Sequence, residues 1–209
     1  MNFQPPKIYA ITDTAVSGLS HVEQVERLIK GGIKLIQIRE KRASPCDFFE
    51  AARAAVEVAR SHGIKIIIND RIDIALVVNA DGVHLGQDDV PPERARAIMG
   101  PKAIIGFSTH SIEQAHRAAR LPVDYIAIGP VFSTLTKDNA DPVVGLDGVA
   151  AVKDKIGVLP LVAIGGINSA NIADVLSSGA DSAAMIGALI SDPERIEQTA
   201  RALVSFVNA

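Results

Sequence analysis

Three polar residues in the second strand-like run of this sequence could bind an anion. Gln37, Arg39 and Lys41 alternate with Ile38 and Glu40, so they share one face of an extended chain. On an exposed antiparallel sheet they would form an ordinary solvated face. Inside a parallel sheet covered by helices, an arginine must be paired or hold an anion, because an unpaired buried charge is very costly. We interpret Arg39 as an anion ligand, with a structural ion pair as the alternative.

Two aspartates follow the next two strand-like runs and could bind a metal ion. Asp70 comes directly after Asn69, and Asp89 comes shortly after the fourth run. If these runs are neighbouring parallel strands, the two carboxylates can converge. Two carboxylates without a cysteine or histidine pair nearby suit a hard ion such as Mg2+. The alternative is that Asp70 caps a short helical turn over residues 71–78.

A long connection follows the sixth strand-like run. It extends to about Gly145 and carries Thr134, Thr136 and Lys137. Connections of that length are usually either functional or disordered. We interpret this one as a lid that covers a substrate.

Hydroxyl and glycine residues at other run ends predict a phosphate site. Ser108 ends the fifth run and could donate a hydrogen bond to a phosphate. Gly165, Gly166 and Gly187 follow the last two runs, where glycines expose backbone N–H groups. Each glycine alone is also an ordinary turn residue. Together with a barrel fold, whose usual phosphate site lies there, they make a phosphate group the predicted ligand.

The candidate site residues can form one site only in a fold that brings the strand ends together. The sequence pattern indicates such a fold, because strand-like and helix-like runs alternate throughout the chain. The strand-like runs are dense in Ile and Val without strict alternation, as in strands covered on both faces. They cover residues 8–12, 33–39, 64–69, 82–85, 103–108, 125–129, 161–164 and 182–186. The helical patterns cover residues 20–30, 44–61, 71–78, 91–99, 111–120, 146–155, 171–178 and 192–208. Ser20, Ser44 and Ser111 stand where N-caps are expected.

The regular alternation predicts an α/β fold, namely a single-domain (β/α)8 TIM barrel over residues 1–209. Such a barrel places its chemistry at the C-terminal ends of its strands, where the polar residues above are found. The alternative is an open doubly wound sheet. It is less favoured because no G-x-G-x-x-G motif follows the first run.

Composition limits the partners of this chain. Its 209 residues include 21 Lys and Arg and 24 Asp and Glu, which gives a net charge of −3, and it has no Trp. These values argue against a non-specific nucleic-acid binder. No run approaches a membrane span, and the first residues lack a signal-peptide pattern. We therefore expect a cytoplasmic enzyme that acts on a small molecule, without nucleic-acid or membrane partners.

Two further groups fit structural roles better than chemical ones. Cys46 is the single cysteine, so it cannot form an internal disulfide, which fits a reducing compartment. Its position near a helix start is incidental in most proteins. His84 lies inside a strand-like run, and we expect it to be a hydrogen-bonded barrel residue and not a base.

Taken in order, these motifs closely resemble those of the thiamine phosphate synthase family. The resemblance runs from about Tyr9 to the last helical pattern, and the joint order and spacing of the motifs is highly specific. The blocks that carry it are Tyr9-Ala10-Ile11-Thr12-Asp13, Gln37-Ile38-Arg39-Glu40-Lys41, Asn69-Asp70-Arg71, Gly82-Val83-His84-Leu85-Gly86-Gln87-Asp88-Asp89, Gly106-Phe107-Ser108, Asp124-Tyr125-Ile126, Gly129-Pro130-Val131-Phe132, Thr134-Leu135-Thr136-Lys137 and Ala163-Ile164-Gly165-Gly166-Ile167.

The resemblance implies a transferase that joins 4-amino-2-methyl-5-hydroxymethylpyrimidine diphosphate to a thiazole phosphate. The products are thiamine phosphate and diphosphate. In the family the C–O bond to diphosphate breaks first, and the thiazole nitrogen attacks the pyrimidine cation that remains. The implied cofactor is Mg2+, held by Asp70 and Asp89 so that it bridges the leaving diphosphate.

The implied substrate ligands divide between the two substrates. Those for the diphosphate oxygens are Arg39, Lys41, Asn69 and Lys137, and those near the pyrimidine and diphosphate are Gln37 and Ser108. Those for the thiazole phosphate are Thr134, Thr136, Gly166, Ile186 and Gly187. The residues predicted to act in catalysis are Arg39, Lys41, Ser108 and Lys137.

One residue departs from the family pattern, and two other functions compete. The family usually has a serine where this chain has Gly187, so a hydroxyl donor is lost while a backbone N–H remains. The related thiazole tautomerase typically lacks the Asn-Asp pair and the Thr-x-Thr-Lys segment present here. A non-catalytic phosphate-binding barrel has no use for the acidic pair and the cations together. The family is commonly homo-oligomeric, which extends to this chain as an expectation.

Overall fold

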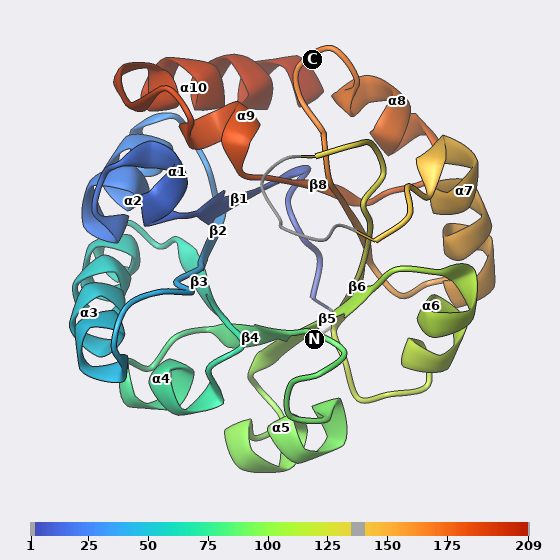
Figure 1. Ribbon diagram of the computed structural model, residues 1–209, viewed down its shortest axis with the longest axis horizontal. Coiled ribbons are helices and arrows are strands. Elements are labelled where there is room, and N and C mark those ends of the chain that lie inside the picture. The colour runs from blue at the N-terminus through green and yellow to red at the C-terminus, as the bar shows by residue number, and fades with distance from the viewer. Residues whose placement is uncertain (1–2, 135–140, 209) are drawn as a thin grey trace.

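Parallel strands close into a barrel at the centre of the molecule (Figure 1). The computed structural model describes residues 3–134 and 141–208. Within them each strand pairs in parallel with its neighbours along the chain, and β8 closes the barrel on β1 through pairs such as Tyr9 with Ala184. The strands are β1 Ile8–Thr12, β2 Leu35–Ile38, β3 Lys65–Asn69, β4 Gly82–Leu85, β5 Ile104–Thr109, β6 Tyr125–Ile128, β7 Leu161–Ile164 and β8 Ser182–Met185. The predicted (β/α)8 barrel is confirmed.

Helices surround the barrel on its outside (Figure 1). They are α1 Thr14–Ser17, α2 His21–Lys30, α3 Pro45–Ser61, α4 Ile72–Val77, α5 Pro92–Met99, α6 Ile112–Ala118, α7 Gly145–Ile156, α8 Ile172–Ser177, α9 Gly187–Ile190 and α10 Ile196–Val207, with the 3-10 turn η1 Pro193–Arg195 before α10. None of the helices in the described ranges is both long and apolar enough to cross a membrane.

Three serines cap helices as predicted, whereas one aspartate that was considered as a cap does not. Ser20, Ser44 and Ser111 each accept a backbone N–H of the first turn, and Ser20 forms a complete capping box with Glu23. By contrast, Asp70 does not cap α4, whose N-cap position is Arg71 and has no side-chain cap. The cap interpretation of Asp70 is therefore wrong.

Two short helices and one break were not predicted. Helices α1 and α9 span a single turn each, which is too short to produce a periodic pattern. The predicted helix over residues 192–208 is divided, because η1 precedes α10.

The strands are buried on both faces, and two apolar layers result. The larger layer lies between the barrel and the helices and includes Ile36, Ile68 and Ile126. The smaller layer fills the barrel interior with alternate residues such as Ile67 and Val162. Burial on both faces explains why the strand sequences show no polar alternation.

Three aspartates close the base of the barrel, at the N-terminal ends of its strands. Each directly precedes an even-numbered strand and accepts the N–H of a residue in the strand before it. The pairs are Asp81 with Ile66 at 2.8 Å, Asp124 with Ile105 at 2.7 Å and Asp181 with Leu161 at 2.8 Å. Each aspartate also pairs with a cation, namely Lys65 at 3.8 Å, Arg96 at 2.6 Å and Lys153 at 2.7 Å, respectively.

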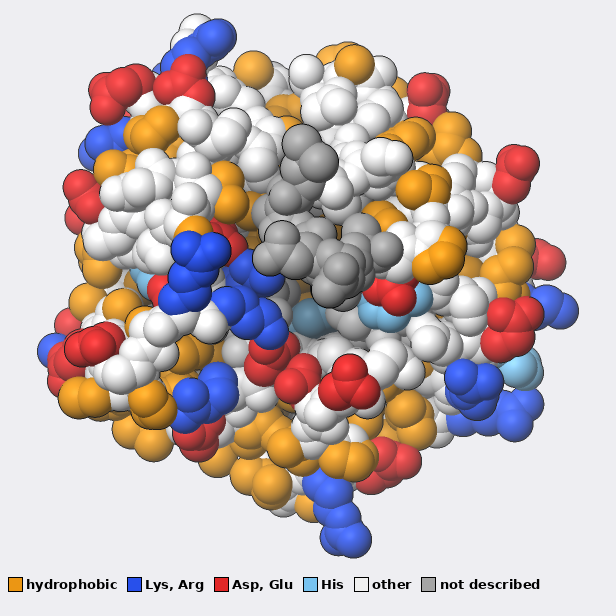
Figure 2. Space-filling model, viewed as in Figure 1, with side chains coloured by type: hydrophobic (Ala, Val, Ile, Leu, Met, Phe, Trp, Pro, Cys, Tyr) orange, Lys and Arg blue, Asp and Glu red, His pale blue; other side chains and the backbone are white. Residues whose placement is uncertain are grey.

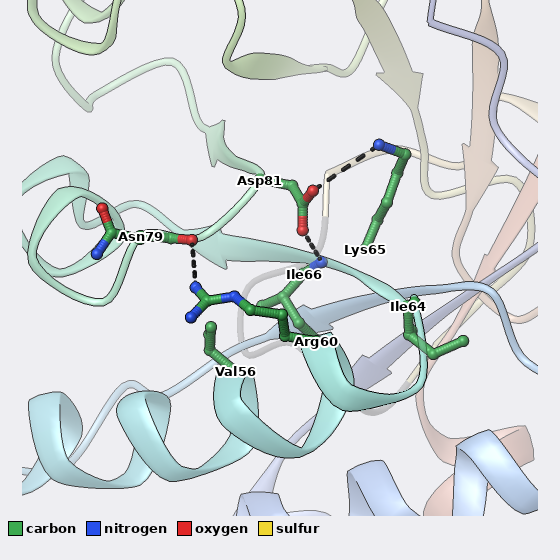
Figure 3. Close-up of a pocket in the computed structure, with 8 residues that line it drawn as sticks. Val56, Arg60, Ile64, Lys65, Ile66, Asn79 and Asp81 are labelled. Carbon is green, nitrogen blue, oxygen red and sulfur yellow. Dashed lines mark hydrogen bonds and ion pairs between the residues drawn. The ribbon is translucent and has the colours of Figure 1, made fainter.

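A cavity of about 240 Å³ lies at this base, beside α3 and β3 (Figure 3). Its cations already have protein partners. Arg60 donates to the carbonyl of Asn79 at 3.1 Å, and Lys65 pairs with Asp81. The cavity lies at the base of the barrel, and its charged side chains are paired within the protein. We therefore assign these charges to stability.

We expect Asp124→Ala to lower the free energy of unfolding by about 2 kcal/mol, because it leaves the Ile105 N–H and the Arg96 guanidinium without their shared acceptor. Urea denaturation of the purified variant measures this change. Asp154→Ala, an exposed position on α7, is the matched control and should change stability by less than about 0.5 kcal/mol. Equal stabilities of the two variants would contradict the role of Asp124.

Candidate functional site

Polar side chains from several strands meet at the opposite end of the barrel. Figure 2 shows Lys and Arg side chains beside Asp and Glu side chains over the barrel centre. The contributing residues include Gln37 of β2, Asn69 of β3 and Ser108 of β5. Each of them occupies an inward-facing position near a C-terminal strand end, as predicted.

The two predicted metal ligands converge. Asp70 and Asp89 follow β3 and β4, and the negative charge of Asp70 acts on the nearby carboxyl group of Asp89. Burial and, after it, the charge of Asp70 raise the pKa of Asp89, against the opposing effect of the Gly86 N–H at 2.7 Å. Asp70 has a left-handed backbone, with φ at 61°, and its N–H donates to the carbonyl of His84 at 2.8 Å. A backbone so constrained holds the Asp70 carboxylate beside Asp89.

This pair suits a divalent cation. Two carboxylates in contact repel each other, and in the described structure Lys41 pairs with Asp70. Mg2+ is usually bound through one or two carboxylates, with waters and substrate phosphates as its other ligands. No group of three or more His, Cys, Asp or Glu suited to a metal occurs in the described residues. The donor set therefore fits a cation that is shared with a phosphorylated ligand.

A buried amide lies next to the acidic pair. Among the described residues, Nδ2 of Asn69 has no hydrogen-bond partner although it is buried. Buried polar groups are almost always paired, so this atom marks a place where a ligand oxygen fits.

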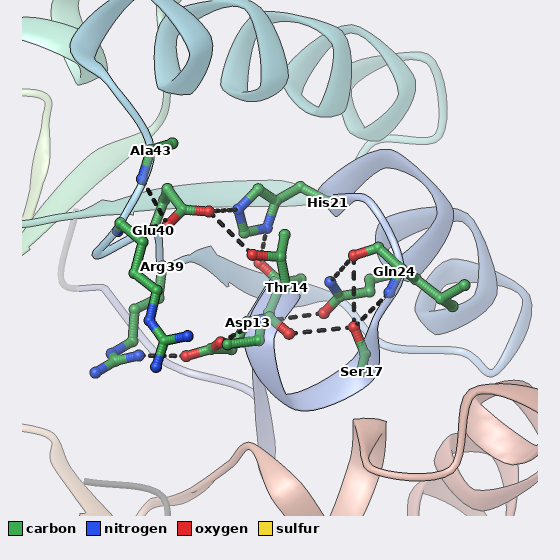
Figure 4. Close-up of polar contacts among 12 residues, drawn as sticks. Asp13, Thr14, Ser17, His21, Gln24, Arg39, Glu40 and Ala43 are labelled. Atoms are coloured by element: carbon green, nitrogen blue, oxygen red, sulfur yellow. Dashed lines mark hydrogen bonds and ion pairs between the residues drawn. The ribbon is translucent and has the colours of Figure 1, made fainter. Parts of the chain in front are cut away.

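Arg39 forms the structural ion pair that was the alternative to anion binding. It donates through Nη1 to Oδ2 of Asp13, and its side chain remains 20% exposed (Figure 4). Asp13 is itself fixed, because its Oδ1 accepts the N–H of Ala15 and its own N–H donates to Gln24 at 3.0 Å. Anion binding by Arg39 stays a prediction, and the two roles are compatible since one Nη forms the pair.

Glu40 fastens the loop that carries the cations. Its Oε1 accepts the N–H of Arg42 at 2.7 Å and that of Ala43 at 3.2 Å, and its Oε2 accepts the Thr14 hydroxyl at 3.1 Å (Figure 4). Burial raises the pKa of Glu40, but the two N–H donors outweigh it and the net shift is downward. His21 lies 3.4 Å from the same carboxylate, and burial lowers its pKa.

The glycines predicted to bind phosphate after β7 have backbone conformations that favour glycine. Gly165 and Gly166 have left-handed backbones, with φ at 103° and 65°. A Cβ on Gly166 would lie 2.7 Å from Phe132 and from the carbonyl of Ser133, so only glycine fits there. Gly187 begins helix α9, directly after Ile186.

The connection after β6 is described in part. Thr134 is half-buried at the end of the first described range. Thr136 and Lys137 lie outside the described residues. The predicted lid and the role of Lys137 therefore stay predictions.

A chain of buried side chains runs through the barrel between two predicted site residues. His84 contacts Ser108 at 2.8 Å and Tyr125 at 2.9 Å, and Tyr9 contacts Tyr125 at 3.0 Å and Gln37 at 2.9 Å. Burial lowers the pKa of His84 to about 4 and raises the pKa values of both tyrosines. The prediction that His84 is a hydrogen-bonded barrel residue is confirmed.

Several functional contacts were not found from the sequence. Asp13 and Glu40 were quoted within motifs, but their contacts with Arg39 and with the loop after β2 were not predicted. The signal for Glu40 is weak but present, since an acidic residue between Arg39 and Lys41 interrupts a basic run. The Tyr9–Tyr125 contact joins positions far apart in the chain, and one sequence offers no signal for it.

Known proteins match this chain over nearly its whole length. The family described as thiamine monophosphate synthase matches residues 8–189. The thiamine-phosphate synthase of Chloroflexus aurantiacus is 43% identical over 202 residues, which cover 95% of this chain and 93% of that protein. The thiamine-phosphate synthase of Pelotomaculum thermopropionicum is 45% identical over 202 residues, covering 96% and 92%. The structure of thiamine phosphate pyrophosphorylase from Pyrococcus furiosus has a TM-score of 0.88 and 35% identity, covering 97% and 95%.

We expect the Asp13–Arg39 pair to contribute more to stability than a surface pair, because its side chains are only 11% and 20% exposed. A double-mutant cycle with Asp13→Asn and Arg39→Met should give a coupling free energy above about 1 kcal/mol. The control cycle uses Glu197→Gln and Arg201→Met, a pair exposed by 42% and 64%, and should give less than about 0.5 kcal/mol. Equal coupling in the two cycles would contradict the importance of Asp13.

Proposed function

The chain belongs to the thiamine monophosphate synthase family and is a transferase of thiamine biosynthesis, and we propose that it joins 4-amino-2-methyl-5-hydroxymethylpyrimidine diphosphate to a thiazole phosphate. The products are thiamine phosphate and diphosphate. The observation that carries this proposal is the convergence of Asp70 and Asp89 at the barrel mouth. Arg39 and Lys41 lie nearby after β2, and the Asn69 amide of β3 has no partner among the described residues.

The proposed reaction begins with the departure of diphosphate. The C–O bond between the pyrimidine methylene and diphosphate breaks, and its electron pair leaves with the diphosphate. Arg39, Lys41 and Asn69 bind the diphosphate oxygens as their charge increases, and Lys137 completes this set. When bound at Asp70 and Asp89, Mg2+ supplies additional positive charge to the leaving group.

The proposed second step forms the new C–N bond. The thiazole nitrogen donates its lone pair to the methylene carbon of the pyrimidine cation, so no protein nucleophile is needed. Thr134, Thr136, Gly166 and the backbone at Ile186 and Gly187 bind the thiazole phosphate. Glycines after the last strands expose backbone N–H groups, which supports this assignment.

The acidic pair favours this reaction over the alternatives. A phosphate-binding scaffold would retain the glycines but has no need to place two carboxylates in contact. A thiazole tautomerase releases no diphosphate, so it has no comparable need for a cation at Asp70 and Asp89.

We also propose that the protein acts in the cytoplasm. The single cysteine, Cys46, is exposed and has no second cysteine in the chain with which to form a disulfide, which suits a reducing compartment. A homo-oligomeric state stays a prediction from the family.

We expect thiamine phosphate to form when the purified protein is mixed with both substrates and Mg2+. Asp89→Asn should lower the rate by about 100-fold or more. It removes one of the two carboxylates proposed to hold the cation that stabilises the leaving diphosphate. The neighbouring Asp88 is exposed, so Asp88→Asn is the matched control and should retain the rate. Product formation is measured by chromatography.

Two outcomes would contradict parts of this proposal. Full turnover in excess EDTA would exclude the metal role of Asp70 and Asp89. No product from the folded wild-type protein would contradict the proposed reaction itself.

A further inference from the structure

The buried chain from Gln37 to Ser108 has a direction. Gln37 donates through Nε2 to the hydroxyl oxygen of Tyr9 at 2.9 Å. Either hydroxyl of the Tyr9–Tyr125 pair, 3.0 Å apart, could donate, and the order that uses every hydrogen has Tyr9 donate to Tyr125 and Tyr125 donate to Nδ1 of His84 at 2.9 Å. Nδ1 is therefore an acceptor, and a neutral His84 carries its hydrogen on Nε2.

The order of donors determines which atoms remain at the two ends. In this order Nε2 of His84 donates to Oγ of Ser108 at 2.8 Å, so the Ser108 hydrogen is available to a ligand. At the other end one N–H of the Gln37 amide is used on Tyr9, and no donor among the described residues meets its Oε1. The barrel mouth thus offers an acceptor at Gln37 and a donor at Ser108.

Gly106 makes this chain possible. In the sheet it lies between His84 of β4 and Tyr125 of β6, in register with both. A Cβ on Gly106 would lie 2.0 Å from the Tyr125 ring and 2.5 Å from Nδ1 of His84. Because glycine has no side chain, the two rings stack across it with centroids 5.5 Å apart.

Burial makes the chain change its direction only as a whole. Tyr9 and Tyr125 are about 1% and 0% exposed, and Gln37 is 2% exposed, so water does not offer competing partners. Reversal would require Gln37 to turn its amide and every hydrogen in the chain to move together, because each buried group must remain paired.

We propose that Tyr9, Tyr125 and His84 are positioning residues that fix Gln37 as a hydrogen-bond acceptor for the exocyclic amine of the pyrimidine substrate. This inference rests on the proposed function. A 4-aminopyrimidine presents an N–H donor, which Oε1 of Gln37 accepts. The 4-oxo analogue presents a carbonyl oxygen at the same place, which Oε1 repels. Tyr9, Tyr125 and His84 therefore favour the amino form without touching the substrate themselves.

The test compares kcat/KM for the amino substrate and for its 4-oxo analogue. Wild-type protein should prefer the amino form by on the order of 10⁴-fold. Tyr125→Phe interrupts the chain and frees Gln37 to turn, so the preference should fall by about tenfold or more while KM for the thiazole phosphate is unchanged. Thr109→Val is the control, since it removes a buried hydroxyl of β5 that bonds Ala127 outside the chain, and it should retain the preference.

An unchanged preference in folded Tyr125→Phe would overturn the inference. If that variant does not fold, Tyr9→Phe interrupts the chain at the next link and carries the same expectation. Loss of preference in Thr109→Val to the same extent would also overturn the inference, because general loosening of the barrel would then explain the effect.

A measurement without turnover separates this inference from the proposed function. ¹⁵N NMR of the imidazole groups reports which ring nitrogen of His84 is protonated in the free protein. The inference expects hydrogen on Nε2 in the wild type, and hydrogen on Nδ1 would overturn it. Absence of thiamine phosphate synthesis would contradict the proposed function but leave this result to decide the direction of the chain.

Discussion

The closed parallel barrel leaves little water in its interior, and this constraint determines how its polar residues are arranged. Every inward polar group must find a partner in the protein or in a ligand. Below the mouth the requirement is met largely by an apolar layer and by the hydrogen-bonded chain through Tyr9, Tyr125 and His84, although the buried Oγ of Ser182 in β8 has no partner among the described residues. At the mouth it is met only partly, since Asn69 keeps a buried amide without a partner among the described residues. In the proposed reaction, an oxygen of the diphosphate would bind at this amide.

The two ends of the barrel use the same residue type for opposite purposes. At the base, Asp124 receives a backbone N–H and an arginine, so its charge is compensated within the protein. At the mouth, Asp89 receives one backbone N–H but faces Asp70, and its pKa is raised in consequence of burial and of that charge. An aspartate satisfied by the protein supports the fold, whereas a pair of aspartates in contact calls for an external cation.

The sequence predicted the barrel because its strands and helices alternate regularly, and it predicted the strand-end residues because the barrel fixes where strands end. The convergence of Asp70 and Asp89 needed only that β3 and β4 be neighbours. By contrast, the contacts below the mouth depend on distances across the barrel, which no local pattern encodes. Gly106 reads as an ordinary strand glycine until β4 and β6 are placed on either side of it. The single-turn helices α1 and α9 escaped prediction because they are too short for periodicity.

The site combines two kinds of binding group that differ in how fixed they are. Arg39 and Lys41 have protein partners, Asp13 and Asp70, that lie at the open end of the barrel. In the proposed reaction, diphosphate and a cation would share or replace those partners. Gln37 and Ser108 are held from below by a buried chain whose members have no alternative partners among the described residues. Exchange of ion pairs suits a leaving group whose charge changes during the reaction. A fixed donor at Ser108 and a fixed acceptor at Gln37 suit recognition of the pyrimidine ring before its bond to diphosphate breaks. The same mouth can therefore be adaptable toward phosphate and selective toward the pyrimidine.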